Sequence, residues 1–538
     1  MNRLLLKIFI LIVAVACSTI IEHIEEDDKF IKIQGKNNNL IFTFSGNING
    51  ETHPCGCRKF PLGGLPQVGG LHQKYRQNGH LIYFDLGDTF FNNKVLPKEF
   101  SESLKYKASV LAEAQKELNV KFALIGEQDF AAGVDYLQAL LKKANYTLLI
   151  SNTKPNFPFT VNPYSILEWG EKRYFIAGIV NPELFNDEIK QKLEDPRLSL
   201  KNILAAFKRN GWQEGNPKHQ LILLSHSGLS FDKQLANDFP QFDWILGAHS
   251  QDFTQTPEMV GKTKICQVLE QNHYQGAITY NALQNEGEFE MVAIRTDLAN
   301  FLKPNPFFGM IDKIKNEYAL IQEKEKEKIV ESTVVDTTQL NQKYKTFSSC
   351  KSCHEEQYKF WQTTKHSIAM TTLYKNNEGK NQDCIGCHAL GFNSPKGFLR
   401  ADDWVVFEEG VDGKKAYFEK FKKIFQNSGR PEHTSEQWEK FDQQMRVKQN
   451  FANVQCLHCH DQNSAHPFNA QDFSTQQLPI LTKSEKEARF AQKCIQCHTL
   501  DRSPEWYVTD QKNRTINKLN LAYFSKQLPK VSCPKLQN

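Results

Sequence analysis

The sequence predicts two folds in tandem, an α/β domain over residues 38–300 and a mostly α, loop-rich domain over residues 346–538. In the first region, short apolar runs alternate with amphipathic helical patterns, as they do in domains with largely buried strands. In the second region strand-like runs are sparse, and four Cys-x-x-Cys-His pentads occur. A chain of 538 residues is long enough for two domains with separate hydrophobic cores.

The N-terminus has the pattern of an export signal. Basic residues accompany an apolar stretch, Leu4–Ala16, that is short for a membrane span. Small residues then lead to Cys17, which resembles a bacterial lipobox. We therefore expect residues 1–16 to be a signal peptide and residues 17–37 to be a tether from a lipid on Cys17, which predicts a membrane-anchored lipoprotein of a bacterial periplasm. The alternative is an ordinary signal peptide with an incidental cysteine, which also predicts export.

Strand and helix patterns alternate along the α/β domain. The strand-like runs are Leu40–Phe44, Leu81–Leu86, Phe122–Ile125, Thr147–Ile150, Tyr174–Val180, Leu221–Leu224 and Trp244–Leu246. The helical patterns include Ser103–Leu118, Gly133–Lys143 and Leu200–Arg209. Residues 262–297 are predicted to form consecutive strands that close the domain.

Residues 301–345 differ from both domains. Met310–Val330 has a helical pattern that contains a run of alternating charge, Glu323–Lys328. Such a run typically forms a solvated face, so we expect a charged helical connector.

The four pentads are the attachment signature of c-type haem. In each, two thiols bind the porphyrin and the histidine is the proximal iron ligand. With 13 Cys and 16 His in the chain, chance gives about 0.01 matches. Zinc ribbons do not call for a histidine after every second cysteine. The sequence thus predicts four covalently bound haems, which also supply much of the local core, on Cys350, Cys353, His354, Cys384, Cys387, His388, Cys456, Cys459, His460, Cys494, Cys497 and His498.

Three further histidines are candidates for distal iron ligands: His366, His433 and His466. His458 lies between two attachment cysteines and is poorly placed to reach an iron. Three distal histidines for four irons predict three bis-histidine haems and one open iron, which could bind a small nitrogen compound.

The second domain resembles the tetrahaem cytochromes that accept electrons from hydroxylamine oxidoreductase, over roughly residues 347–505. Cys350–His354 is followed by Trp361 and Lys365–Ser367, and Val454–His460 is followed by His466. The resemblance implies distal roles for His366 and His466 and three bis-histidine haems beside one five-coordinate haem. His458 and Asp461 depart from the family pattern, which usually has Glu and Gly there.

The first domain resembles the 5'-nucleotidase-type metallophosphoesterases, whose metal ligands follow the order Asp-x-His, Gly-Asp, Gly-Asn-His-Glu, His and Gly-His-x-His. This chain has the same frame at Asn47–Asn49, Gly87–Asp88, Gly126–Phe130, Ser225–His226 and Gly247–Gln251. The resemblance implies an α/β sandwich in which two divalent metals activate a water for attack on phosphorus.

Several ligands of that frame are replaced by amides. Asn47 and Asn49 replace the first Asp and His, Gln128 replaces the histidine of the third motif, and Gln251 replaces the last histidine. Amides are weak, neutral ligands, so we expect no two-metal site and no ordinary phosphoesterase activity. We expect at most one divalent metal, zinc or copper, at a non-haem site built from Asp88, His226, His249, Glu127 and Asn49.

Cys55 and Cys57 follow the first motif in a Pro-Cys-Gly-Cys segment. They are candidate catalytic residues, because their thiols would face the old metal cleft and complete a soft ligand set with His226 and His249. The alternative is a structural disulfide that involves Cys266 or Cys533.

These observations predict a lipid-anchored tetrahaem cytochrome that carries electrons to or from a redox partner protein. The front domain would bind a substrate or partner. One alternative is an oxidoreductase acting on a small nitrogen or sulfur compound, at an open iron or at Cys55 and Cys57. A second is an active metallohydrolase fused to a cytochrome. The net charge of +5 and the lack of a basic cluster give no reason to expect nucleic acid as a partner.

Overall fold

The computed structural model describes residues 29–33, 39–54, 61–145, 147–250, 252–332, 344–425, 429–460, 482–500, 502–509 and 516–534. Cys17, Cys55, Cys57, Gln251 and His466 lie outside these ranges. The chain forms two compact units: the first extends to Ile311, and the second begins at Asp312 and includes Pro97–Ser103. No helix in the described part is long and apolar enough to cross a membrane.

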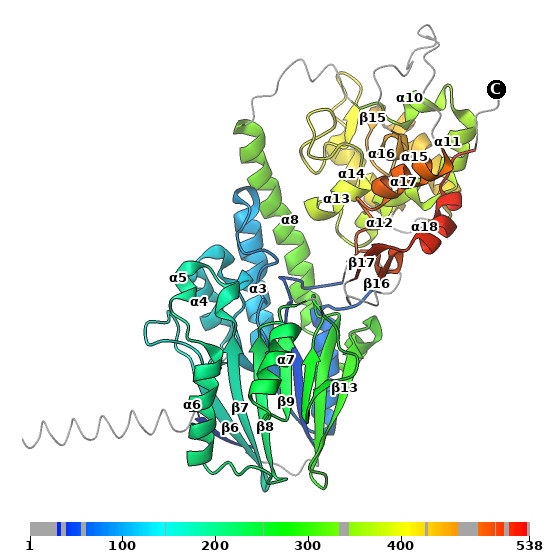
Figure 1. Cartoon of the computed structure of the whole chain (residues 1–538). Coiled ribbons are helices and arrows are strands. Elements are labelled where there is room, and N and C mark those ends of the chain that lie inside the picture. The colour runs from blue at the N-terminus through cyan, green and yellow to red at the C-terminus, as the bar shows by residue number, and fades with distance from the viewer. Residues whose placement is uncertain are drawn as a thin grey trace, which may run out of the picture. The chain divides into compact units, whose positions relative to one another are not determined.

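Two mixed sheets form the first unit (Figure 1). The seven-stranded sheet has the order β1-β6-β7-β8-β9-β11-β10 and the six-stranded sheet the order β13-β12-β2-β3-β4-β5. The strands are β1 (Phe30–Ile33), β2 (Asn39–Ser45), β3 (His80–Asp85), β4 (Val120–Ala123), β5 (Thr147–Leu148), β6 (Tyr164–Trp169), β7 (Lys172–Val180), β8 (His219–His226), β9 (Trp244–Ala248), β10 (Glu258–Val260), β11 (Thr263–Gln267), β12 (Tyr274–Asn281) and β13 (Gly287–Ala293).

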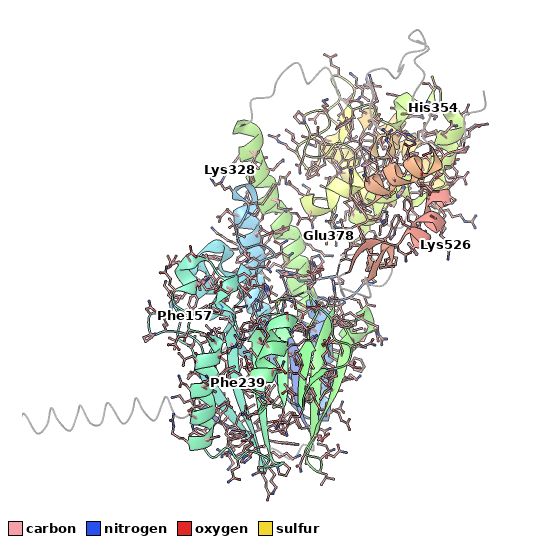
Figure 2. The ribbon with its side chains drawn as sticks, in the orientation of Figure 1. Phe157, Phe239, Lys328, His354, Glu378 and Lys526 are labelled. Carbon is pink, nitrogen blue, oxygen red and sulfur yellow. The ribbon has the colours of Figure 1, made fainter. Side chains whose placement is uncertain are left out.

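Aromatic side chains join the facing sheets of the first unit. Phe42 on β2 lies 5.1 Å from Tyr174 on β7, and Tyr174 lies 4.8 Å from Tyr280 on β12, between ring centroids. A second core fills the outer face of the seven-stranded sheet, where α6 (Pro196–Arg209) and α7 (Leu229–Asp238) pack on it. Phe239, labelled in Figure 2, belongs to this second core. The parallel strands β7, β8 and β9 are therefore buried on both sides, as their unbroken apolar runs predict.

All seven predicted strands are present, and so are the predicted helices as α3 (Ser101–Leu118), α4 (Val134–Ala144) and α6. The strands predicted to close the domain are β11, β12 and β13. Besides β6, β10, α7 and the short helix α5 (Asp187–Lys190), two more elements were not predicted. The first is α2 (Leu65–Asn78), which contains the glycine pair Gly69–Gly70; a Cβ on Gly70 would lie 1.9 Å from the carbonyl oxygen of Leu298, so close backbone packing requires this weak helix former.

The second is β1, which corrects the predicted tether of residues 17–37. Phe30–Ile33 pairs in parallel with Ile166–Trp169 of β6 and so forms the edge of the seven-stranded sheet. Its residues alternate between exposed and half-buried, so the strand has no continuous apolar run that would reveal it in the sequence.

The predicted connector is helical, as α8 (Phe307–Ser332), but it is not a solvated rod. Glu325 and Lys326, within the alternating charge run, are each only 8% exposed. Within the second unit, Glu325 Oε1 accepts hydrogen bonds from the backbone N–H groups of Glu102 and Ser103, at 2.7 and 3.3 Å. Lys326 Nζ donates to Asn393 Oδ1 at 2.7 Å. The charge run is thus a set of specific contacts.

The second unit is mostly helical. Its elements after α8 are α10 (Phe347–Lys351), α11 (Glu355–Gln362), α12 (Ala369–Lys375), α13 (Gln382–His388), α14 (Lys414–Phe425), α15 (Pro431–Gln444), α16 (Cys456–Cys459), α17 (Lys483–Cys494) and α18 (Leu521–Gln527), with the short strands β14 (Val405–Phe407), β15 (Val447–Asn450), β16 (Tyr507–Thr509) and β17 (Ile516–Leu519).

The second unit also has a side-chain core of its own. Trp404, Tyr417, Phe421, Trp438 and Phe441 pack together on β14, α14 and α15, and none is more than 5% exposed. The share of the core that haem supplies stays a prediction beside this side-chain core. The many aromatic residues of this region were the sequence signal for the side-chain core.

Candidate metal centre and haem-binding motifs

The candidate metal centre of the first unit lies at the carboxyl ends of five strands. Asn47 and Asn49 follow β2, and Asp88 follows β3. Glu127 and Gln128 follow β4, His226 ends β8, and His249 follows β9. Parallel strands end on the same edge of a sheet, so this topology gathers residues far apart in sequence.

Strained backbone holds these side chains in place. Asn47, Asn49, Asp88 and His249 have φ values of 52°, 56°, 55° and 83°, in the left-handed region that residues other than glycine rarely adopt. Hydrogen bonds from Asn47 N to Gly87 O (2.8 Å) and from Asn49 N to Asp88 O (2.9 Å) maintain them. Such strain is typical of functional sites.

Four side chains converge on one point in this centre. Asp88, Glu127, His226 and His249 each offer one ligand atom, and these atoms all lie within 4.8 Å of one another. His226 is fully buried, and its Nδ1 donates to the carbonyl oxygen of Leu86 at 2.7 Å. That bond leaves His226 Nε2 as the ligand atom, 3.1 Å from Glu127 Oε2 and 3.5 Å from Asp88 Oδ2.

The charges in this cluster fit a cation. Burial would lower the pKa of His226, but the carboxylates of Asp88 and Glu127 outweigh burial and raise it well above the usual value. Burial would likewise raise the pKa of Glu127, but His226 and His249 lower it below its usual range. His249 Nδ1 is buried without a hydrogen bond, 3.4 Å from Glu127 Oε1. The cluster therefore offers two imidazoles and two carboxylates, a set of ligands that suits one divalent metal ion.

The described amides that replace metal ligands form hydrogen bonds within the centre instead. Gln128 Nε2 donates to Asp88 Oδ2 at 2.8 Å and lies 3.4 Å from Asn49 Oδ1. Asn49 Nδ2 donates in turn to Glu270 Oε2 at 3.5 Å. Asn47 Oδ1 accepts from the backbone N–H of His249 at 2.9 Å. The residues present therefore do not fit a two-metal centre, since the oxygen of Asp88 that would bridge to a second ion already accepts a hydrogen bond.

The structure brings together four of the five predicted non-haem ligands, and the fifth, Asn49, belongs to the amide chain. The described ligand set is made of nitrogen and oxygen, and the thiolate part of the predicted soft site stays a prediction. Cys55 and Cys57 lie outside the described residues. The predicted disulfide with Cys266 or Cys533 is not formed: Cys266 is a buried free thiol on β11, and Cys533 is an exposed free thiol.

Three residues of this centre were not predicted. Asp129 is 3% exposed and accepts hydrogen bonds from the backbone N–H groups of Asp88, Thr89, Phe90 and Gly126, which ties the loops after β3 and β4 together. Burial and the charge of Asp88 raise the pKa of Asp129 to about 7. The other two are Glu270 and Lys94, whose Nζ lies 3.6 Å from Glu127 Oε1. Neither lies in a recognisable motif.

The pentads of the second unit fold as helical turns. The N–H of His354, His460 and His498 each donates to the carbonyl oxygen of the first cysteine of the same pentad, at 2.9 Å. This turn places both cysteines and the histidine on one side, as covalent attachment of one porphyrin requires. His354 is labelled in Figure 2.

The pentads lie next to each other in pairs. Cys350 lies beside Cys456, which brings the first and third pentads together. Cys387 and Cys497 do the same for the second and fourth. Arg502 supports the second pair, because its Nη1 donates to Cys387 Sγ at 2.9 Å.

Two pentad histidines have Nδ1 engaged by a neighbouring oxygen atom, which would leave Nε2 for an iron. His388 Nδ1 donates to the carbonyl oxygen of Ala369 at 2.7 Å, and His498 Nδ1 lies 2.9 Å from Ser503 Oγ. Burial lowers the pKa of both imidazoles, so both are neutral near pH 7. A neutral imidazole with Nδ1 engaged presents Nε2 as a ligand, so these residues fit a haem iron.

His366 is the predicted distal ligand that the structure places opposite a pentad histidine. Its ring centroid lies 6.5 Å from that of His498, with the ring planes 52° apart. Burial, with the neighbouring His498 and His388, lowers the pKa of His366 to about 4 and keeps it neutral. His366 thus lies near the histidines of the fourth and second pentads, and its distal role stays a prediction.

The remaining histidines differ from His366. His433 is exposed on α15, the helix that packs against α11 after the first pentad and carries Glu439, the ion-pair partner of Lys351. Its distal role stays a prediction, and so does that of His466. His458 has a structural role: its Nδ1 accepts from the backbone N–H of Gln455 at 3.0 Å, and a second hydrogen bond reaches the backbone of Ala389.

Comparisons with known proteins agree with both halves. The chain matches the family model of "Cytochrome c554 and c-prime" over residues 349–412. The C-terminal unit is thus a cytochrome c-type domain.

The N-terminal half is similar to 5'-nucleotidases. It is 26% identical over 196 residues to 5'-nucleotidase from Bos taurus, covering 35% of this chain and 32% of that protein. It is 27% identical over 161 residues to 5'-nucleotidase from Homo sapiens, covering 28% of this chain and 27% of that protein. The chain spans about a third of the length of these curated relatives.

Solved structures give weaker matches. Sulfate thiohydrolase from Thermus thermophilus aligns at 17% identity and a TM-score of 0.41, covering 51% of this chain and 61% of that one. A 5'-nucleotidase precursor, also from Thermus thermophilus, aligns at 18% identity and a TM-score of 0.41, covering 52% of this chain and 58% of that one.

Proposed function

We propose that this protein is a four-haem electron carrier whose front domain binds one divalent metal ion and no longer works as a two-metal hydrolase. The observation that carries the first part is the grouping of four pentads in one unit, in adjacent pairs, with His366 facing His498. Haem iron, when bound, supplies one-electron oxidation and reduction. The protein's part is to hold each imidazole neutral and oriented and to exclude water around it.

The second part rests on the amide chain. Asp88, Glu127, His226 and His249 would hold a single ion, because amides replace the other ligands and Gln128 donates hydrogen bonds to both oxygens of Asp88. The two carboxylates balance the charge of a divalent ion, and the ligand set suits zinc, with copper as the alternative. In two-metal phosphoesterases the two ions together clamp the attacking and leaving oxygens, and a one-metal centre lacks that clamp. We infer that the domain uses its metal to bind a substrate or partner.

Cellular placement follows from the same proposal. Covalent haem attachment in bacteria takes place outside the cytoplasmic membrane, so we propose an exported protein held at the membrane by a lipid on Cys17. A redox partner protein would exchange electrons with the second unit through a small, transient interface.

Composition of the purified full-length protein tests this proposal. We expect four haems per chain by the pyridine haemochrome assay and one non-haem divalent metal by mass spectrometry of metals. Fewer than four haems would contradict the electron-carrier proposal. Two non-haem metals, together with turnover of a generic phosphodiester, would contradict the one-metal proposal for the front domain.

A second candidate function is an oxidoreductase at an open iron. It is favoured by the three distal candidates for four pentads, of which His366 faces one pentad histidine. Binding of carbon monoxide to one reduced haem, with a high-spin ferric signal of the same stoichiometry, would support it. A protein in which every haem is low-spin and unreactive would exclude it.

A further inference from the structure

The imidazole of His498 is held from two sides by the segment that follows its own pentad. Nδ1 lies 2.9 Å from Ser503 Oγ. The indole of Trp506 stacks on the imidazole, with ring centroids 4.3 Å apart and planes only 12° apart. The two residues share one short turn, in which Trp506 N–H donates to Ser503 O at 2.9 Å.

The surroundings keep Trp506 in this position. The residue is 8% exposed and belongs to a small core with Ala491 and Phe524. The backbone N–H of Asn520 donates to the carbonyl oxygen of Trp506 at 2.7 Å. Tyr507 OH reaches back to the carbonyl oxygen of His498 at 2.8 Å, which closes the turn onto the pentad. These contacts hold the indole of Trp506 against one face of the His498 imidazole.

The other pentad histidines have different neighbours. His388 Nδ1 donates to a backbone carbonyl, that of Ala369, and a carbonyl is a fixed acceptor. His460 meets the ring of Phe490 edge-on, at 6.1 Å and 84°. A serine hydroxyl, by contrast, can accept or donate and rotates freely, so it holds an imidazole less firmly than a carbonyl does. The stacked indole compensates for this freedom at His498.

We propose that Ser503 and Trp506 are positioning residues that fix the rotation of the His498 imidazole and thereby tune the iron that the fourth pentad holds. This inference rests on the proposed haem function. A ligating imidazole can turn about its bond to the metal, and its outer hydrogen bond sets both its orientation and its basicity. The hydrogen bond to Ser503 and the stack on Trp506 select one rotation, and they set the 52° angle to the ring of His366.

Electron paramagnetic resonance of the oxidised full-length protein tests the proposal, because the signal of a low-spin haem depends on the angle between its two axial imidazoles. We expect Trp506→Leu and Ser503→Ala each to shift one low-spin signal and leave the others in place. Trp506→Phe, which keeps an aromatic face, should retain most of the original signal. Ser503→Ala should also change the equilibrium constant for reduction of one haem by about fivefold, as expected for one hydrogen bond.

Tyr523→Leu is the matched control, since Tyr523 contacts Trp506 at 6.1 Å but does not touch the imidazole. The haem content of each variant is measured first, so a failure of the haem proposal shows as fewer than four haems in the wild type. Unchanged signals and reduction equilibria in a fully loaded Ser503→Ala protein would overturn the positioning role. If Trp506→Leu loses a haem, Ser503→Ala and Trp506→Phe decide the question. A uniform shift of every haem signal would also overturn it.

Discussion

One amide, that of Gln128, is the closest side-chain neighbour of Asp88 that supports the proposed one-metal centre. Gln128 contacts both oxygens of Asp88: its backbone N–H donates to Oδ1 at 2.9 Å and its Nε2 to Oδ2 at 2.8 Å. Gly126 makes this approach possible, because a Cβ there would lie 2.0 Å from Asp88 Oδ1. Both oxygens of Asp88 therefore accept hydrogen bonds from Gln128, while Oδ2 also lies 3.5 Å from His226 Nε2.

Restoring the family's ligands should restore the second ion. We expect the combined change Asn47→Asp, Asn49→His, Gln128→His and Gln251→His to raise the non-haem metal content from one to two per chain. The physical reason is that carboxylate and imidazole bind divalent metals where amides do not. Metal analysis after gel filtration measures this, with Asp88→Asn as the control that should lose metal altogether. A restored protein that still holds one ion would show that the amides are not the obstacle.

Removal of His366 should open one iron. His366→Ala leaves the imidazole of His498 without its facing partner, so one haem should become high-spin and bind carbon monoxide when reduced. Optical spectra with carbon monoxide measure the reactive fraction, which should rise by one haem in four relative to the wild type. Lys365→Ala, an exposed neighbour, should leave the spectrum unchanged. If a haem other than that of the fourth pentad became high-spin, the proposed pairing of His366 with His498 would be contradicted.

Among the elements, α8 shows how a charge pattern can mislead. The helix itself is predicted by its periodicity, but the alternating charges give no sign that Glu325 is buried or that it receives the first N–H groups of α3. Those N–H groups lack helical partners, and an acceptor from elsewhere in the fold satisfies them. Sequence patterns record local structure, whereas this capping contact joins residues more than two hundred positions apart.

The same contact predicts a stability effect. Glu325→Ala should lower the free energy of unfolding by about 1–2 kcal/mol, as loss of a helix cap does. Glu327→Ala removes an exposed carboxylate from the same run and should change it by less than about 0.5 kcal/mol. Urea titrations followed by circular dichroism compare the two. Equal effects would mean that the run acts through general charge.

The aromatic core on α14 and α15 contains a buried acid, Asp442, that should make the stability of the second unit depend on pH. Burial raises the pKa of Asp442 to about 6, although Tyr417 OH and Asn450 Nδ2 donate to it at 2.6 and 2.7 Å. The folded state thus binds this proton more tightly than the unfolded chain, whose aspartate titrates near 4. The protonated Asp442 contributes up to about 3 kcal/mol to the free energy of unfolding. That contribution is complete below about pH 4 and is lost as the pH rises through about 6.

Asp442→Asn should remove that part of the pH dependence. Relative to the wild type, the variant should gain stability between pH 4 and pH 6.5, as measured by urea unfolding at several pH values. A difference between the two proteins that is constant with pH would show that Asp442 is ionised throughout.

At the scale of the whole molecule, the two folds were predictable because each has its own sequence signal. Buried parallel strands give unbroken apolar runs, and the pentads identify the second unit. The cluster of Asp88, Glu127, His226 and His249 was also predictable, since the strand order brings the motifs that carry these residues to one edge. The roles of Glu270, Asp129 and Ser503 were not, because each acts through a contact that only the folded chain creates.

Two units with separate cores should unfold in distinguishable steps. We expect a chelator to lower the midpoint of the transition that involves the first unit, because loss of a bound ion removes its stabilisation by mass action. The Soret absorbance, which reports the second unit, should keep its midpoint. Thermal unfolding with and without chelator measures both. One coincident transition that shifts as a whole would contradict this independence.

The amide of Gln128 differs from a metal ion in one further respect: it has no dissociation constant. A second ion can be lost to dilution, acid or a competing chelator, whereas a side chain is always present at the same concentration as the protein. Once the first ion is bound, the charge around Asp88 therefore does not change with the metal concentration of the surroundings. The centre should accordingly fill and empty in a single step, as a simple one-site equilibrium.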